Sequence, residues 1–217
     1  ETPPATNMGI LAAMVPLLTV LLSALILKEP PTLGGVVGGV LAFIGVTVLL
    51  GRGNPLSLLQ LEVAQGDALM VVAATCYALY GVMLKRWAMN LPPWVMLYAQ
   101  VCFAVLFLLP PYLMGPMTPV DGKNVWLILY AGIPASVITT FLWMRAVRQI
   151  GANQASIFIN LMPLFSALIA MALLGEQVSG FHFIGGLLIL AGVIMAQTLT
   201  RPLVRAAAAR KTQSVQQ

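Results

Sequence analysis

The sequence predicts an all-α integral membrane protein, a polytopic bundle of transmembrane helices. Three observations predict it: the composition, a series of charge-free apolar runs, and an internal repeat. Of the 217 residues, 60% are hydrophobic and only 8% are charged, with a mean hydropathy of +0.96. A soluble chain carries roughly 25% charged residues. So few charges cannot cover a water-exposed surface, so lipid must be the solvent over much of it.

Seven apolar runs without charge give the predicted helices in chain order. They cover residues 8–27, 33–50, 68–84, 91–110, 125–144, 155–174 and 183–200. A helix rises about 1.5 Å per residue and the hydrocarbon core is about 30 Å thick, so each run can span it. Backbone groups in lipid must satisfy their own hydrogen bonds, which a helix does. The alternation typical of a membrane β-strand is absent from these runs.

The charges between the runs predict an orientation. Assigning alternate loops to the two sides places nine basic residues on one side and two, Arg52 and Lys123, on the other. By the positive-inside rule, the richer side and the C-terminal tail lie in the cytoplasm. The nine are Lys28, Lys85, Arg86, Arg145, Arg148, Arg201, Arg205, Arg210 and Lys211. These charges form no single basic face, which argues against a nucleic-acid partner despite the net charge of +5.

A repeat with a fixed offset of 147 residues relates the first two helices to the last two. Without any gap, 12 of 46 positions are identical between residues 5–50 and 152–197. The identities include one proline, one glutamate and three glycines. Matched pairs are Pro16 with Pro163, Glu29 with Glu176, Gly38 with Gly185, Gly39 with Gly186 and Gly45 with Gly192.

The spacing of the repeat predicts inverted topology. Each matched helix is separated from its counterpart by five crossings, an odd number, so the two run in opposite directions through the membrane. Inverted repeats are an architecture of secondary transporters, in which substrate binds near the midplane between the two halves.

The order of these motifs resembles the EamA-like family of the drug/metabolite transporter superfamily. The resemblance rests on Met162-Pro163-Leu164-Phe165, Leu174-Gly175-Glu176, Gly185-Gly186 and Ala191-Gly192-Val193, with Gly66-Asp67-Ala68, the stretch Tyr77-Ala78-Leu79-Tyr80 and Lys85-Arg86 opening a repeat. It implies two five-helix repeats, ten helices in all, of which seven are visible. Residues 1–51 are then the end of the first repeat, 52–65 the connecting loop, 66–200 the second repeat and 201–217 a cytoplasmic tail. We therefore expect about 85 further residues, three helices, ahead of Glu1.

The candidate substrate-binding residues are uncharged, because no charged residue lies within a predicted span. Either the transporter uses no side-chain proton relay, or the relay lies on the further helices. The candidates are Asn160, Tyr80 and Trp143 first, then Tyr77, Gln100, Thr139 and Thr140. An amide facing lipid is costly, so Asn160 is expected to point into the bundle. Interhelical hydrogen bonding and packing are the alternative role for each.

Two prolines and two carboxylates complete the candidates. Pro16 and Pro163 are predicted kinks, as hinges or as static bends. Glu29 and Glu176 are predicted to be structural, accepting from nearby N–H groups, and Thr32 and Ser179 to cap the helices that follow them.

Overlapping GxxxG pairs from Gly34 to Gly39 permit close helix packing. The expected partner of these glycines is residues 183–200 of the same chain, and the alternative is a second subunit in a homodimer.

The function expected from the repeat and the resemblance is a secondary transporter, an exporter of small metabolites such as amino acids. The resemblance also suggests a bacterial inner membrane protein. A non-transporting accessory subunit is the alternative. An intramembrane aspartyl protease is excluded, because no span carries a carboxylate. Ser179 and His182 lie in a predicted loop and make no serine-protease pair. Two cysteines and one histidine are too few for a metal site, and no cofactor is expected.

Overall fold

The computed structural model describes residues 4–54, 65–115, 122–174 and 179–202. These residues are almost entirely helical, and they contain seven helices long and apolar enough to cross a membrane. The seven spans are Gly9–Leu27, Leu33–Leu50, Ala68–Trp87, Pro93–Met114, Asn124–Ile150, Ala152–Leu173 and Gly180–Thr198. The seven predicted spans are confirmed. Glu176, most of the connector and the tail from Arg205 onward lie outside the described residues.

Several spans are built from more than one helical segment. The first contains α1 (Pro4–Ala13), α2 (Val15–Leu22) and the π-turn η1 (Ser23–Leu27); α3 is Leu33–Leu50, α4 is Gln65–Trp87 and α5 is Pro93–Met114. The fifth contains α6 (Gly122–Tyr130), the π-segment η3 (Ala131–Ile138) and α7 (Thr139–Ile150). The sixth contains α8 (Ala152–Ile157), the 3-10 turn η4 (Phe158–Asn160) and α9 (Leu161–Leu174), and α10 is Gly180–Thr198.

The chain divides into two compact units. The first holds residues 1–86 and 151–217, and the second holds residues 87–150. The first unit therefore contains both halves of the sequence repeat, brought together from the two ends of the chain.

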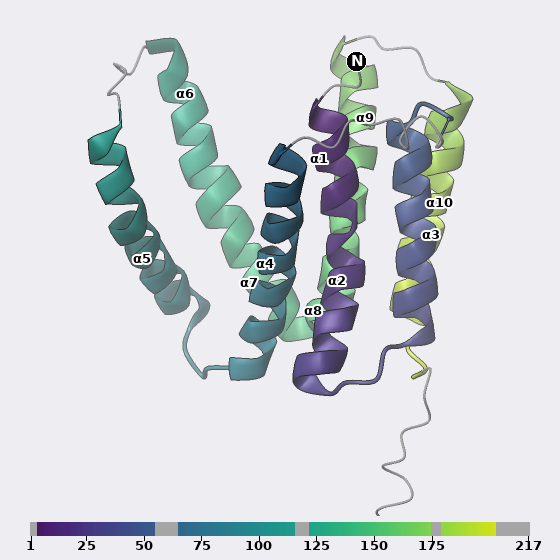
Figure 1. Cartoon of the computed structure of the whole chain (residues 1–217), viewed down its shortest axis with the longest axis horizontal. Helices are drawn as coiled ribbons and strands as arrows, with labels where there is room; N and C mark the ends of the chain where they lie inside the picture. Colours follow the sequence, from purple (N-terminus) through teal and green to yellow (C-terminus); the bar gives the residue numbers. More distant parts are fainter. Residues whose placement is uncertain (1–3, 55–64, 116–121, 175–178, 203–217) are drawn as a thin grey trace, which may run out of the picture. The chain divides into compact units, whose positions relative to one another are not determined.

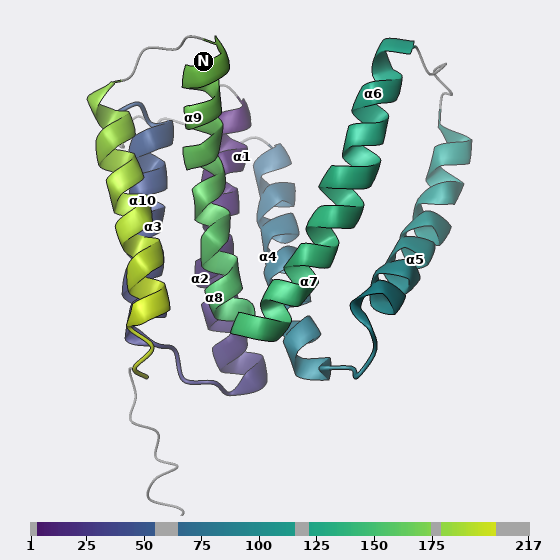
Figure 2. The same ribbon diagram turned by 180° about the vertical axis from the view of Figure 1, so that it is seen from behind.

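Helices α3 and α10 form the closest pair in the first unit, side by side and antiparallel (Figures 1 and 2). Glycine permits this approach. A Cβ at Gly45 would stand 2.8 Å from the carbonyl oxygen of Gly185, and a Cβ at Gly38 would overlap the carbonyl oxygen of Gly192. Gly34 lies equally close to the backbone of Met195 and Leu199. The expected partner within the chain is thus confirmed for Gly34 and Gly38.

The contacts of this pair obey the sequence repeat. Gly38 meets Gly192, the counterpart of Gly45, while Gly45 meets Gly185, the counterpart of Gly38. When two residues are in contact and their two repeat counterparts are also in contact, the two halves are related by a two-fold axis. Elsewhere the same rule holds, since a Cβ at Gly39 would meet Leu17 and one at Gly186 would meet Leu164, the counterpart of Leu17.

Equivalent hydroxyl residues begin the two helices. The Thr32 side chain accepts a hydrogen bond of 3.0 Å from the Gly35 N–H at the start of α3. At the start of α10, the Ser179 N–H donates to His182 Nδ1 over 3.1 Å in a capping box. Both caps were predicted, and the second accounts for the Ser179 and His182 pair as a structural element.

The second unit packs α5 against α7. The rings of Trp94 and Phe141 stack with centroids 4.0 Å apart, and Arg148 donates to the Met89 carbonyl at 3.1 Å. Pro134 lies inside η3, and the Thr139 hydroxyl donates to the Pro134 carbonyl at 3.0 Å. Proline lacks the N–H that a regular helix needs, which explains the wider turn at this position.

Candidate functional site

The first unit contains two broken helices, interrupted at positions related by the repeat. One break is at Met14, between α1 and α2, and the other is the 3-10 turn η4 before α9. Each break lies just ahead of a proline, Pro16 or Pro163. Proline has no amide hydrogen to donate to the carbonyl four residues earlier, on Ala12 or Ile159. Discontinuous helices near the midplane are a feature of transporter binding sites.

A cavity of about 460 Å³ lies beside these breaks, within the first unit. It extends along α9 from Ile159 to Ala170, a length of about 16 Å at 1.5 Å per residue. Apolar side chains dominate the lining, and the polar members are Asn160, Ser166 and His182. The full lining is Gly9, Ala12, Ala13, Leu49, Leu50, Ile159, Asn160, Met162, Pro163, Ser166, Ala167, Ala170 and His182.

Asn160 is the most informative residue of this cavity. Its side chain is 1% exposed, and neither its Oδ1 nor its Nδ2 has a hydrogen-bond partner among the described residues. Burying an amide without a partner costs about 1–3 kcal/mol in proteins. Such a group in a native fold calls for an explanation, and one explanation is a ligand that supplies the missing hydrogen bonds. Asn160 can offer both a donor and an acceptor, but both atoms are buried in this conformation, so a ligand would reach them only after neighbouring side chains move.

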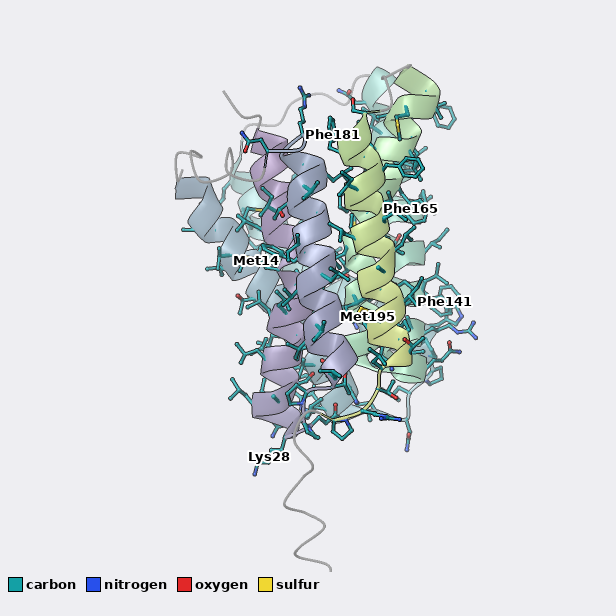
Figure 3. All side chains as sticks on the ribbon, turned by 90° about the vertical axis from the view of Figure 1, so that its right-hand side faces the viewer. Met14, Lys28, Phe141, Phe165, Phe181 and Met195 are labelled. Atoms are coloured by element: carbon teal, nitrogen blue, oxygen red, sulfur yellow. The ribbon has the colours of Figure 1, made fainter. Side chains whose placement is uncertain are left out.

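His182 lies at the other end of the cavity, in the first turn of α10. Its Nδ1 accepts a hydrogen bond from the Ser179 N–H, so the neutral ring carries its proton on Nε2. The Phe181 ring lies beside it, with centroids 4.2 Å apart. Figure 3 shows Phe181 at the end of the bundle opposite Lys28. His182 therefore has one fixed donor at the cavity end farthest from Lys28.

The other predicted binding residues do not line this cavity. Tyr77 and Tyr80 on α4 lie near each other, with ring centroids 6.5 Å apart. Gln100, Thr139, Thr140 and Trp143 belong to the second unit. There, Gln100 Nε2 donates to the Met144 sulfur at 3.4 Å, a contact between α5 and α7. Of the seven candidates, the structure places only Asn160 in the cavity of the first unit.

The carboxylate of Glu29 forms an ion pair with Lys85, a residue that the sequence did not predict as its partner. Lys85 Nζ, in the last turn of α4, lies 2.7 Å from Glu29 Oε1. We expected Glu29 to accept from nearby N–H groups; the hydrogen bond that the structure shows is donated by Lys85 Nζ, 56 residues away in sequence. The sequence showed a basic residue at the end of α4, but it did not indicate which carboxylate this residue would pair with.

The helices and their order match a known family. The model of the EamA-like transporter family matches residues 1–51 and 64–198. The chain belongs to the EamA-like transporter family. Members found by comparison include the uncharacterized transporter YyaM of Bacillus subtilis, 30% identical over 201 residues, which cover 90% of this chain and 65% of YyaM. The name of this relative is that of a transporter.

Further relatives agree with this assignment, and a solved structure shares the fold. Protein PecM of Dickeya dadantii is 25% identical over 91% of this chain and 66% of its own length. The uncharacterized inner membrane transporter YicL of Salmonella typhimurium is 29% identical over 76% of this chain and 55% of its own length. A crystal structure, titled only as that of a protein, shares the fold with a TM-score of 0.75 and 24% identity, over 92% of this chain and 69% of that one. The chain thus spans 55% to 66% of the length of these curated relatives.

Proposed function

We propose that this protein is the larger part of a secondary transporter that exports small metabolites, such as amino acids, by alternating access between inverted repeats. The observation that carries the proposal is Asn160, a buried amide without a partner that lines a cavity at a helix break. A polar group in a membrane-spanning segment is costly and usually functional. The repeat-related contacts of α3 and α10 support the inverted architecture.

The chemistry of the cavity favours an uncharged hydrogen-bonding group at its deep end. Among the described residues that line the cavity, none is Asp, Glu, Lys or Arg. A charged group next to Asn160 would lose its hydration without gaining a counter-ion. The proposed substrate therefore places a neutral polar group at Asn160 and any carboxylate toward the Nε2–H of His182.

The proposed orientation follows from the charges. With the C-terminus in the cytoplasm of a bacterial cell, the end of the bundle that carries Lys28 faces inward, and His182 faces outward. The cavity then opens toward the outside, as expected for one state of an exporter. Three further helices ahead of residue 1 complete the first repeat in this proposal, consistent with the greater length of the relatives.

Transport by the full-length parent protein tests the proposal. Reconstituted liposomes would be loaded with labelled aromatic, small neutral and basic amino acids in turn, and efflux would be measured. We expect Asn160→Ala to reduce efflux of the preferred class by roughly 5- to 100-fold, the equivalent of one or two lost hydrogen bonds. Asn90→Ala, at an exposed loop position, is the matched control and should leave efflux unchanged.

Two outcomes would contradict the proposal. Equal efflux by the Asn160→Ala and Asn90→Ala proteins would remove Asn160 from the site. Absence of efflux from correctly inserted parent protein across the whole panel would favour an accessory subunit instead.

A further inference from the structure

The second unit carries two exposed arginines that no acidic side chain of that unit balances. Arg145 and Arg148 lie three residues apart near the end of α7. From 87 to 150 the single acidic residue of the sequence is Asp121, a whole predicted span before Arg145 along the chain. Within the part of the chain that the structure describes, neither arginine forms an ion pair. Because like charges one helical turn apart repel each other, an anion that contacts both would be stabilised here.

Arg148 is held in place at the edge of an open cavity of about 470 Å³. The cavity lies within the second unit, and the connection from Ala88 to Pro93 forms its other side. One guanidinium nitrogen, Nη2, donates to the Met89 carbonyl at 3.1 Å and to the sulfur of the buried Met96. The described residues supply no acceptor for the N–H groups on the other two nitrogens of this side chain. The guanidinium is therefore fixed in position with donors left over, the arrangement that suits an acidic oxygen.

Aromatic side chains lie next to these cations, toward the middle of the span. Phe141, Arg145 and Arg148 stand at positions i, i+4 and i+7, which share one face of a helix. The guanidinium carbon of Arg145 lies 6.0 Å from the centre of the Phe141 ring, and this ring stacks on Trp94 of α5. The start of α5 and the end of α7 lie at the same end of the second unit (Figure 2).

The exposure of Trp94 indicates the depth of this surface in the membrane. Its side chain is 60% exposed at the first turn of α5, and tryptophan at the end of a span typically lies at the membrane–water interface. Arg145 and Arg148 follow the aromatic pair toward the end of α7, at the level of the lipid headgroups. A soluble anion would use the two cations and leave the aromatic rings without a role. A phospholipid with a net negative charge would use both.

We propose that Arg145 and Arg148 bind the phosphate headgroup of an anionic phospholipid, whose acyl chains lie along Phe141 and Trp94. Basic pockets next to transmembrane helices on the cytoplasmic side are suited to anionic headgroups, and the positive-inside rule assigns this end to the cytoplasm. Both the cations and the aromatic rings come from α5, α7 and the connection ahead of α5. Binding of this lipid does not depend on which solute is transported.

Native mass spectrometry of the delipidated full-length parent protein tests the inference. The protein would be titrated with phosphatidylglycerol, which carries a net negative charge, and in parallel with zwitterionic phosphatidylcholine of the same acyl chains. We expect Arg145→Gln and Arg148→Gln each to weaken binding of phosphatidylglycerol about fivefold, the fold-change for one basic residue near a charged lipid surface. Binding of phosphatidylcholine should not change.

Two further variants separate a lipid site from other roles of these arginines. Arg201→Gln is the matched control, because it removes one exposed arginine from the same predicted side of the membrane but from the first unit. Arg148→Gln also removes the bond to the Met89 carbonyl, whereas Arg145→Gln leaves that bond intact. Arg148→Lys keeps the charge and should recover part of the affinity for phosphatidylglycerol.

Three results would overturn the inference. Unchanged binding of phosphatidylglycerol by both Arg145→Gln and Arg148→Gln would show that these arginines are covered or paired in the full-length protein. An equal loss in Arg201→Gln would show a general attraction of the basic side instead of a site. Displacement of phosphatidylglycerol by millimolar inorganic phosphate would identify a soluble anion as the ligand. None of these results involves efflux, so the transporter proposal would stand in each case.

Discussion

Substitution of adjacent glycines on α3 provides a sharp test of the two-fold packing. Gly38 faces α10, where a Cβ would overlap the Gly192 carbonyl and stand 2.9 Å from the Ala196 amide nitrogen. Gly39 faces α2, where a Cβ would meet the Leu17 side chain, whose Cδ2 atom would stand 3.0 Å away. Backbone atoms of a packed helix cannot rotate away, whereas the end of a leucine side chain can.

The expected free-energy difference follows from these contacts. Replacing glycine by alanine inside a helix gains about 0.5–1 kcal/mol from backbone entropy, and this gain applies to both positions. At Gly38 the gain is opposed by overpacking, which costs about 1–3 kcal/mol because the two helices must separate. We therefore expect Gly38→Ala to be about 1–3 kcal/mol less stable to unfolding than Gly39→Ala.

The assay is reversible unfolding of the purified protein by a denaturing detergent, followed by tryptophan fluorescence. Gly180→Ala is a further control, because its Cβ would meet nothing within 4 Å. Gly45→Ala should behave like Gly38→Ala, since the repeat gives it the same backbone contact on α10. Equal unfolding free energies for Gly38→Ala and Gly39→Ala would refute the close antiparallel packing of α3 and α10.

Three other predictions concern the caps, the ion pair and the buried amide. Thr32→Ala and Ser179→Ala should each lower the free energy of unfolding by about 1 kcal/mol, the usual value of an N-cap, in the same assay; no loss at either would contradict the capping. Lys85→Gln should cost less than about 1 kcal/mol because the pair with Glu29 is partly exposed, and the loss should shrink with added salt. Asn160→Leu should raise the free energy of unfolding while abolishing transport, because it removes an unsatisfied amide without leaving a cavity; reduced stability would mean that the amide has a partner in the fold.

The helical spans and the repeat could be predicted from the sequence because both depend on local composition. Seven apolar runs have the length that a bilayer imposes, and no soluble fold tolerates so few charges. The contact of Gly38 with the 183–200 segment was predictable because glycines that permit close approach recur at the same register in both halves. The helix breaks were predictable because each depends on one proline, Pro16 or Pro163.

Contacts between segments far apart in the sequence were harder to predict. Tyr80 and Asn160 are both polar residues in spans, and nothing local distinguishes the one that lines the cavity from the one that does not. The partner of Glu29 was equally hidden, because ion pairing depends on where the end of α4 lies in space.

Under the proposed alternating access, the two-fold pairing of α3 and α10 would let one sequence supply two arrangements at small cost. Exchanging the two halves converts the contact of Gly38 with Gly192 into the contact of Gly185 with Gly45, and both contacts are already present. The closest helix pair is therefore unchanged by the exchange and needs no repacking. In the described residues α8 packs against α2, and α1 packs against α3 and η4. Under the proposed alternating access, the glycine-based pair of α3 and α10 would stay fixed while the segments next to the breaks at Met14 and η4 change their packing.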